Sequence, residues 1–213
     1  MKNKALLPKF WNNDLAYLFG LLLGDGSLPK SKTIKPNGDY QDRYIIHFFS
    51  NSKNFSEEVY IPLFIRLFSI SPRLDVRKIK NRNVLYDVRI ESIMIYKFLE
   101  KIGFTTGRKA KIAKVPNIPN KYKVYVLAGL LDTDGGKKGN GFGLSTASEY
   151  LASFCIKIFE KYKLPYHSTP WYYNNHIYHQ IYIGKKNMHQ ILEYIPIKNE
   201  DKIKYIKSYA LVA

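Results

Sequence analysis

The sequence predicts an α+β protein built from two related halves, each with the element order αββαββα. Two observations predict this plan: a leucine-rich stretch that occurs twice, and the same order of helical and alternating patterns after each copy. The copies lie 109 residues apart, measured from Asp25 to Asp134, which is about half of the 213-residue chain. We therefore expect a first repeat at 1–114, a linker at 115–121 and a second repeat at 122–213.

Each leucine-rich stretch is expected to form an apolar helix that ends at a glycine. The copies span 17–26 and 125–135, with leucines at helical spacing and a closing glycine where a C-terminal cap belongs. Gly20 and Gly129 lie inside these helices, where glycine costs about 1 kcal/mol relative to alanine. We therefore expect the two helices to pack closely at these glycines.

Both helices are expected to end on an acidic side chain, Asp25 or Asp134. A carboxylate there faces the negative end of the helix dipole and the unpaired carbonyls, and a bound divalent cation would offset this repulsion. Carboxylates and main-chain carbonyls are hard oxygen ligands that suit Mg²⁺ or Ca²⁺. Two such helix ends side by side would suit in-line attack on a phosphodiester. The alternative is that each Asp-Gly pair is only a C-cap turn.

The remaining elements of the first half are two hairpins, each followed by a helix. We expect a hairpin over 27–49, a helix over 53–69 interrupted at Pro62, strands at 73–80 and 84–91 around a turn at 80–83, and a helix over 92–102. In the second hairpin Arg73, Asp75 and Arg77 alternate with Leu74 and Val76, so one face is apolar and the other charged. Such a charged face can read base edges in a DNA major groove, although the alternation also fits an ordinary solvated face.

The second half is expected to repeat this order after its motif helix. Its expected elements are a hairpin over 137–146, a helix over 148–162, strands at 166–173 and 176–183, a helix over 186–195 and a basic segment over 198–207. The basic side chains that we expect to face DNA in the two halves are Lys30, Lys32, Arg43, Arg73, Arg77, Arg89 and Lys138.

The composition favours a nucleic-acid partner. The chain has 34 Lys and Arg against 17 Asp and Glu, a formal charge of +17, spread over both halves, which favours a phosphate-tracking surface over a generally basic protein. No apolar run approaches the roughly 20 residues of a membrane span, so no membrane partner is expected. One cysteine, Cys155, excludes an internal disulfide and predicts an intracellular, reducing compartment, either a prokaryotic cytoplasm or an organelle.

The second leucine-rich stretch, Leu127-Ala-Gly-Leu-Leu-Asp-Thr-Asp-Gly135, resembles the signature of the LAGLIDADG homing endonucleases at seven of nine positions. The first stretch, 18–26, is a looser match that keeps the glycine, the final acid and the closing glycine. The resemblance extends over essentially the whole chain. It implies that the motif helices form the interface between pseudo-symmetric halves whose antiparallel sheets make a saddle over DNA.

The resemblance also implies the chemistry of the site. By position, Asp25 and Asp134 would bind Mg²⁺ together with the carbonyl oxygens of Gly24 and Thr133. Ca²⁺ would bind without supporting cleavage. A monomer would cut both strands of a long, asymmetric DNA target and leave 3′ overhangs.

Basic side chains near the metal would orient the attacking water or balance charge in the transition state. By position, Lys109, Lys137 and Lys202 are the candidates, and the alternative for each is a solvated or phosphate-contacting lysine. The first stretch has Leu23 where the second has Asp132, so we interpret Asp132 as a polar contact at a helix end rather than as a catalytic group.

The sequence therefore predicts a metal-dependent, site-specific DNA endonuclease. Two other functions stay open: an intron maturase that binds its host RNA, and a regulator that binds DNA without cutting it. The presence of both motif acids argues against the regulator.

Overall fold

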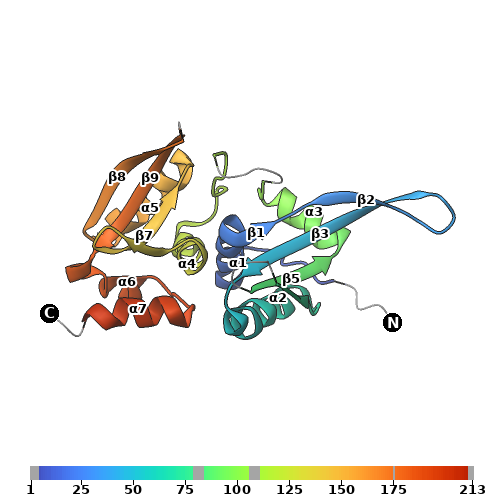
Figure 1. Cartoon of the computed structure of the whole chain (residues 1–213), viewed down its shortest axis with the longest axis horizontal. Helices are drawn as coiled ribbons and strands as arrows, with labels where there is room; N and C mark the ends of the chain where they lie inside the picture. Colours follow the sequence, from blue (N-terminus) through green and yellow to red (C-terminus); the bar gives the residue numbers. More distant parts are fainter. Residues whose placement is uncertain (1–4, 79–83, 106–110, 175, 211–213) are drawn as a thin grey trace. The chain divides into compact units, whose positions relative to one another are not determined.

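The computed structural model shows a mixed α+β chain with two antiparallel sheets, so the predicted fold class is confirmed (Figure 1). The structure describes residues 5–78, 84–105, 111–174 and 176–210. Among these, no helix is long and apolar enough to cross a bilayer.

The chain divides by its contacts into two compact units. The first unit takes 1–10 and 25–107, and the second takes 11–24 and 108–213. Most of the first motif helix therefore packs within the second unit. The sequence boundaries of the two repeats, with a linker at 115–121, stay a prediction.

The first unit is an antiparallel sheet with helices on one face. Its strands are β1 (Gly26–Ser27), β2 (Lys30–Ile34), β3 (Tyr40–Ser50), β4 (Arg73–Arg77) and β5 (Leu85–Glu91), in the order β1-β3-β5-β4 with β2 beside β3. Phe48 and Val88 lie opposite each other in this sheet and are fully buried. Phe48 stacks on Tyr60, with ring centroids 4.0 Å apart. The core of this unit therefore lies on the helix-covered face.

The segment expected to be a helix over 53–69 interrupted at Pro62 is helical from 53 to 68, and its hydrogen bonding changes just before this proline instead of breaking. A π-helical turn, Phe55–Tyr60, is followed by α2 (Ile61–Phe68), whose first turn contains Pro62. A proline fits in the first turn of a helix because the N–H that it lacks has no partner there. The next helix of this unit is α3 (Ile93–Lys101). The expected hairpin turn at 80–83 lies outside the described residues.

The second unit repeats the strand order of the first. Its strands are β6 (Gly136–Lys138), β7 (Gly141–Thr146), β8 (Tyr166–Tyr173) and β9 (His176–Gly184), in the order β6-β7-β9-β8. Helix α5 (Glu149–Lys161) packs on β7 and β9. Phe142 and Ile183 are paired across these two strands and fully buried, so the core again lies on the helix side of the sheet.

The end of the chain differs from the sequence prediction. The expected helix over 186–195 is a 3-10 turn, Lys185–Asn187, followed by the short α6 (Gln190–Tyr194). The basic segment over 198–207, for which no helix was predicted, lies largely within α7 (Glu200–Ala210). The side-chain oxygen of Asn199 accepts a hydrogen bond from the backbone N–H of Asp201 at 3.1 Å. An asparagine followed by two acids is typical of a helix start, and this signal was missed.

Candidate functional site

The two motif helices, α1 (Asn13–Asp25) and α4 (Lys123–Thr133), touch through their backbones. A Cβ atom added at Gly20 would lie 2.9 Å from the carbonyl carbon of Val126. One added at Gly129 would lie 2.6 Å from the backbone nitrogen of Leu21 and closer still to the carbonyl oxygen of Tyr17. No side chain fits at either position, so both glycines allow the close helix packing expected of them.

The same helix pair brings Gly24 against the end of α4. A Cβ atom at Gly24 would lie 2.7 Å from Cβ of Thr133 and 3.4 Å from Cγ of Asp134. Asp134 is exposed and follows α4 directly, and its backbone N–H donates to the carbonyl of Leu130 at 2.9 Å. Asp25 is bonded to Gly24 as the last residue of α1 and is partly buried. Three of the four residues expected to hold metal therefore meet within the second unit.

One of the three candidate lysines reaches this helix end. The Lys202 ammonium, on α7, lies 3.3 Å from the carbonyl oxygen of Thr133 and also donates to the carbonyl of Gly135. A cation is favoured here because the carbonyls that end a helix carry partial negative charge. Lys137 is exposed on β6, three residues beyond Asp134. Lys109 lies outside the described residues.

The donor set at the end of α4 fits a hard divalent cation. It combines the exposed carboxylate of Asp134 with the carbonyl of Thr133, which already accepts a hydrogen bond from an ammonium group. Within the described part of the chain, no three His, Cys, Asp or Glu side chains gather as a metal-binding group. Mg²⁺ is commonly held by one or two carboxylates together with water and substrate phosphate oxygens, so a sparse set of acidic ligands is compatible with it.

A buried carboxylate fixes the position of α7 relative to the motif helices. Asp132 is only 2% exposed and accepts hydrogen bonds from the Tyr17 hydroxyl at 2.5 Å and from the backbone N–H groups of Lys198 at 2.8 Å and Asn199 at 3.0 Å. Burial raises the pKa of Asp132 to about 6, although these hydrogen bonds oppose the rise. Asp132 thereby ties α1, α4 and the start of α7 together, and Lys202 lies in the first turn of that helix.

The arginines of the first sheet lie on its open face, the one opposite Phe48. In the register, Arg73 lies opposite Arg89 and Asp75 lies opposite Asp87. Carboxylates hold these arginines and Arg43: Arg73 bonds Asp75, Arg77 bonds Asp87, Arg43 bonds Glu91, and Arg89 lies 3.9 Å from Glu91. Each arginine is therefore paired with a carboxylate, most closely where Asp87 is buried, while Arg73 stays largely exposed.

Asp87 is the buried member of this ionic cluster. Its side chain is fully buried, and it bonds both Arg77 and the His47 ring, whose Nδ1 lies 2.7 Å from Oδ1. The guanidinium of Arg77 also lies over the Phe49 ring, 5.6 Å from its centroid. A buried carboxylate on the open side of a sheet was not expected from the alternation of residues.

The other predicted DNA-binding lysines do not share one surface. Lys30 and Lys32 lie opposite Tyr44 and Asp42, whereas Arg43 lies opposite Ser31 on the other face of the β2–β3 hairpin. The hydrogen bond from Lys30, with a separation of 3.0 Å, lowers the pKa of Asp42. Lys138 belongs to the second sheet, where it lies opposite Gly141.

The open face of the second sheet is aromatic, a feature that the sequence reasoning missed. Directly paired residues lie on one face, so the pairs Trp171–Tyr178, Tyr173–His176 and His167–Tyr182 lie opposite the buried Ile181 and Ile183. Trp171 is 48% exposed and Tyr173 is 55% exposed. The signal in the sequence was the absence of Asp, Glu, Lys and Arg from β8 and β9.

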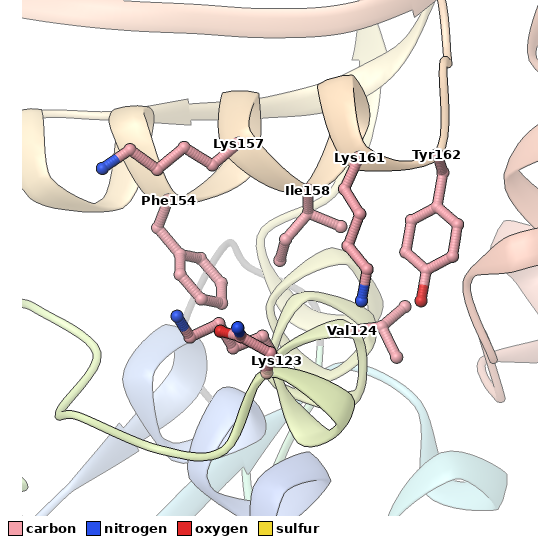
Figure 2. Close-up of a pocket in the computed structure, with 8 residues that line it drawn as sticks. Lys123, Val124, Phe154, Lys157, Ile158, Lys161 and Tyr162 are labelled. Carbon is pink, nitrogen blue, oxygen red and sulfur yellow. The ribbon is translucent and has the colours of Figure 1, made fainter.

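A cavity of about 340 Å³ lies between the start of α4 and α5 (Figure 2). The cavity is lined by lysines and by apolar side chains. The lining residues are Asn120, Lys123, Val124, Phe154, Lys157, Ile158, Lys161 and Tyr162. None of these residues is a carboxylate. The cavity begins at the opposite end of α4 from Asp134, about 15 Å away at 1.5 Å per residue, so it is separate from the helix-end site.

Comparisons with known proteins agree with this architecture. Residues 12–103 match the model of the LAGLIDADG-like domain. No curated protein sequence matches the chain.

Solved structures resemble the chain over most of its length. The chain is similar to I-DmoI in complex with DNA and Mn, with 18% identity over 86% of this chain and 96% of that one and a TM-score of 0.61. It is also similar to I-WcaI bound to its DNA recognition sequence, with 18% identity over 92% and 87% and a TM-score of 0.55. The LAGLIDADG meganuclease I-AabMI bound to uncleaved DNA matches at 14% identity over 92% and 88%, with a TM-score of 0.53. Residues 12–103 therefore carry a LAGLIDADG-like domain, and the chain, with two packed motif helices and two sheets of one strand order in one polypeptide, has the fold of these solved proteins.

Proposed function

We propose that this protein is a site-specific DNA endonuclease that depends on a divalent metal, normally Mg²⁺. It acts as a monomer on a long, asymmetric duplex, cuts both strands and leaves 3′ overhangs. The fold supports this proposal because it resembles proteins solved with DNA and with Mn, Ca or Mg. The charge of +17 also favours a polyanionic partner.

The observation that carries the proposal is the end of α4. There the Asp134 carboxylate, the Thr133 carbonyl and the Lys202 ammonium gather where Gly24 of α1 packs against the helix. We propose that Asp25, the residue after Gly24, joins this group, so that Asp25 and Asp134 with the carbonyls of Gly24 and Thr133 hold the cation.

The chain's own groups would bind and orient the phosphodiester. The Lys202 ammonium is placed to balance negative charge on the phosphate as attack proceeds, and Lys137 and Lys109 are candidates for the same role or for orienting the attacking water. A bound divalent cation would supply Lewis-acid stabilisation of that phosphate and a more acidic water. The arginines on the open face of the first sheet would contact base edges and phosphates.

Cleavage of a duplex library tests the proposal. The protein would be incubated with plasmids that carry randomised inserts, or with a candidate intron-insertion site, in Mg²⁺ and separately in Ca²⁺. We expect binding in both and double-strand cutting with 3′ overhangs in Mg²⁺ alone. Binding without cutting in either ion would indicate a non-cleaving regulator, and stimulated splicing of a host intron without DNA cleavage would indicate a maturase.

The metal site is tested by replacing its acids. The Asp25→Asn, Asp134→Asn double variant is expected to bind the selected duplex but to lose cleavage by a factor of 10³ or more, since removal of one stabilising group alone typically costs about 10²–10³. Asp14→Asn, at the opposite end of α1, is the matched control and should cut normally. Cleavage by the double variant would refute the assignment of both acids.

The predicted compartment is likewise a proposal. Cys155 is fully buried in α5, and burial raises the pKa of its thiol to about 12, so the native thiol is protected from oxidation wherever the protein works.

A further inference from the structure

The two sheets present different chemistry on their open faces. The second hairpin of the first sheet, β4 and β5, carries six charged side chains, and all of them lie on its open face: Arg73, Asp75, Arg77, Asp87, Arg89 and Glu91. The corresponding hairpin of the second sheet, β8 and β9, carries no Asp, Glu, Lys or Arg in its described strand residues. If both faces contact DNA, they cannot read it with the same groups.

The open face of the second sheet carries two groups of rings, separated by the pair Thr169–Gln180. Trp171 stacks on Tyr173 with centroids 5.5 Å apart and planes at 24°, and it also contacts Tyr178 at 5.5 Å. Further along the same face, the His167 ring stacks on Tyr182 at 5.0 Å. The rings brace one another, so the exposed edges of Trp171 and Tyr173 form a fixed apolar surface.

A polyanion is the occupant that fits this surface. Exposed aromatic patches mark interaction sites, and the charge of this chain selects a nucleic acid from the partners that such a patch could take. Basic groups flank these rings: the Lys111 ammonium lies 3.1 Å from Nδ1 of His176, and Lys138 lies on β6 of the same sheet. These lysines are placed to contact phosphates on either side.

The major groove of duplex DNA offers such a face one apolar group, the 5-methyl of thymine. Paired bases present only their edges there, so rings standing on a sheet cannot stack on them. The rings contain no carboxylate or guanidinium that would select cytosine or guanine, and the one side-chain amide of β8 and β9 on this face, Gln180, is of the kind that bonds adenine, the partner of thymine.

We propose that the open face of the second sheet, centred on Trp171 and Tyr173, recognises thymine methyl groups and so selects A·T pairs in the half of the target that it contacts. This inference rests on the proposed DNA-binding function. In the other half, the arginines of the first sheet, which carboxylates hold in place, supply the polar readout.

Replacement of thymine by deoxyuridine tests the inference, because this change removes the methyl group and leaves base pairing intact. Duplexes selected from a random pool by binding in Ca²⁺ would be resynthesised with deoxyuridine in one half or the other. We expect the dissociation constant to rise about fourfold for each contacted methyl group that is lost. This rise should occur for deoxyuridine in only one half of the target, and the selected sequences should be rich in A·T pairs in that half.

Two variants of the same strand assign the effect to this face. Trp171→Ala should weaken binding to the thymine duplex and should remove its sensitivity to deoxyuridine. Tyr172→Ala is the matched control, because Tyr172 is 71% exposed on the same strand but is paired with Ile177 on the opposite face. It should keep both affinity and sensitivity.

Several results would overturn the inference. Equal affinity for thymine and deoxyuridine duplexes, G·C-rich selected sequences, or unchanged sensitivity in Trp171→Ala would each show that the face does not read methyl groups. A larger loss of single-stranded than of duplex binding in Trp171→Ala would show that the rings stack on unpaired bases instead. If no duplex binds at all, the proposed function fails, whereas intact duplex binding without a methyl effect refutes this inference alone.

Discussion

The two sheets of this protein share a strand order but differ in the chemistry of their open faces. In the first, carboxylates hold arginines across the strands, and the fully buried Asp87 bonds both Arg77 and His47. In the second, the equivalent strands present Trp171 and Tyr173 and no charged side chain within the described residues. The core faces are alike, since each packs apolar side chains under helices.

This difference shows which positions a repeated fold constrains. Side chains on the core face must be apolar and of suitable volume, because they pack against helices at close to crystalline density. Side chains on the open face carry no such requirement, so the two sheets can diverge in their recognition chemistry while they keep one topology.

The largest expected effect tests the shared part of the architecture, the packing of α1 on α4. Gly129→Ala should reduce the free energy of unfolding by about 3 kcal/mol, because its methyl group would overlap the backbone of Tyr17 and Leu21. Urea denaturation followed by circular dichroism measures this change. Gly136→Ala is the control, with no heavy atom within 4 Å of its added Cβ, and should change stability by less than about 0.5 kcal/mol.

A stability near that of the native chain for Gly129→Ala would mean that the helices separate at little cost. Glycine at position 129 would then not be required for this helix packing.

The second prediction tests whether the charged face of the first sheet is also structural. Asp87→Ala should reduce the free energy of unfolding by about 2 kcal/mol, less than the loss of a fully buried ion pair because Arg77 is half exposed and can turn toward water. Asp75→Ala, whose partner Arg73 is 76% exposed, should cost less than about 1 kcal/mol. Equal effects of the two changes would show that Asp87 is only a surface partner.

The smallest expected effect separates the two faces by their response to salt. Arg73→Gln should lower the slope of log affinity against log salt concentration by about 0.9 if this guanidinium neutralises one phosphate. Trp171→Ala should weaken binding without a change in slope, because an apolar contact releases no counterion. Titrations of one duplex between low and moderate salt measure both slopes.

A reduced slope in Trp171→Ala would mean that this part of the second sheet contributes electrostatically. The two faces would then differ only in how strongly their contribution to affinity depends on salt.

Much of the local structure was predictable from sequence because it follows from short-range periodicity. Leucines at helical spacing identified α1 and α4, alternation identified the hairpins, and Pro62 marked the point where the π-helical turn changes to α2. The prediction was less accurate at the end of the chain, where the expected helix over 186–195 is a 3-10 turn and a short helix. The largely unpredicted α7 has its start signal in Asn199 and the acids that follow it.

The sequence predicted only part of the candidate site. The motif named Asp25, Asp134 and their neighbouring carbonyls, because two copies of one pattern kept an acid at the same position. Lys202 was a candidate from position alone. Its contact with the carbonyl of Thr133, 69 residues earlier, depends on α7, which Asp132 ties to α1 and α4.

The sequence by itself determined most of the elements before residue 185, the two motif acids and the excess of positive charge, because each follows from spacing or composition. The tertiary structure alone decided which arginine meets which carboxylate, which lysine reaches the helix end and which rings gather on the open face of the second sheet. The physical reason is that these contacts join residues far apart in the chain. Their partners are selected by strand register and by helix packing, which the identity of the residues alone does not specify.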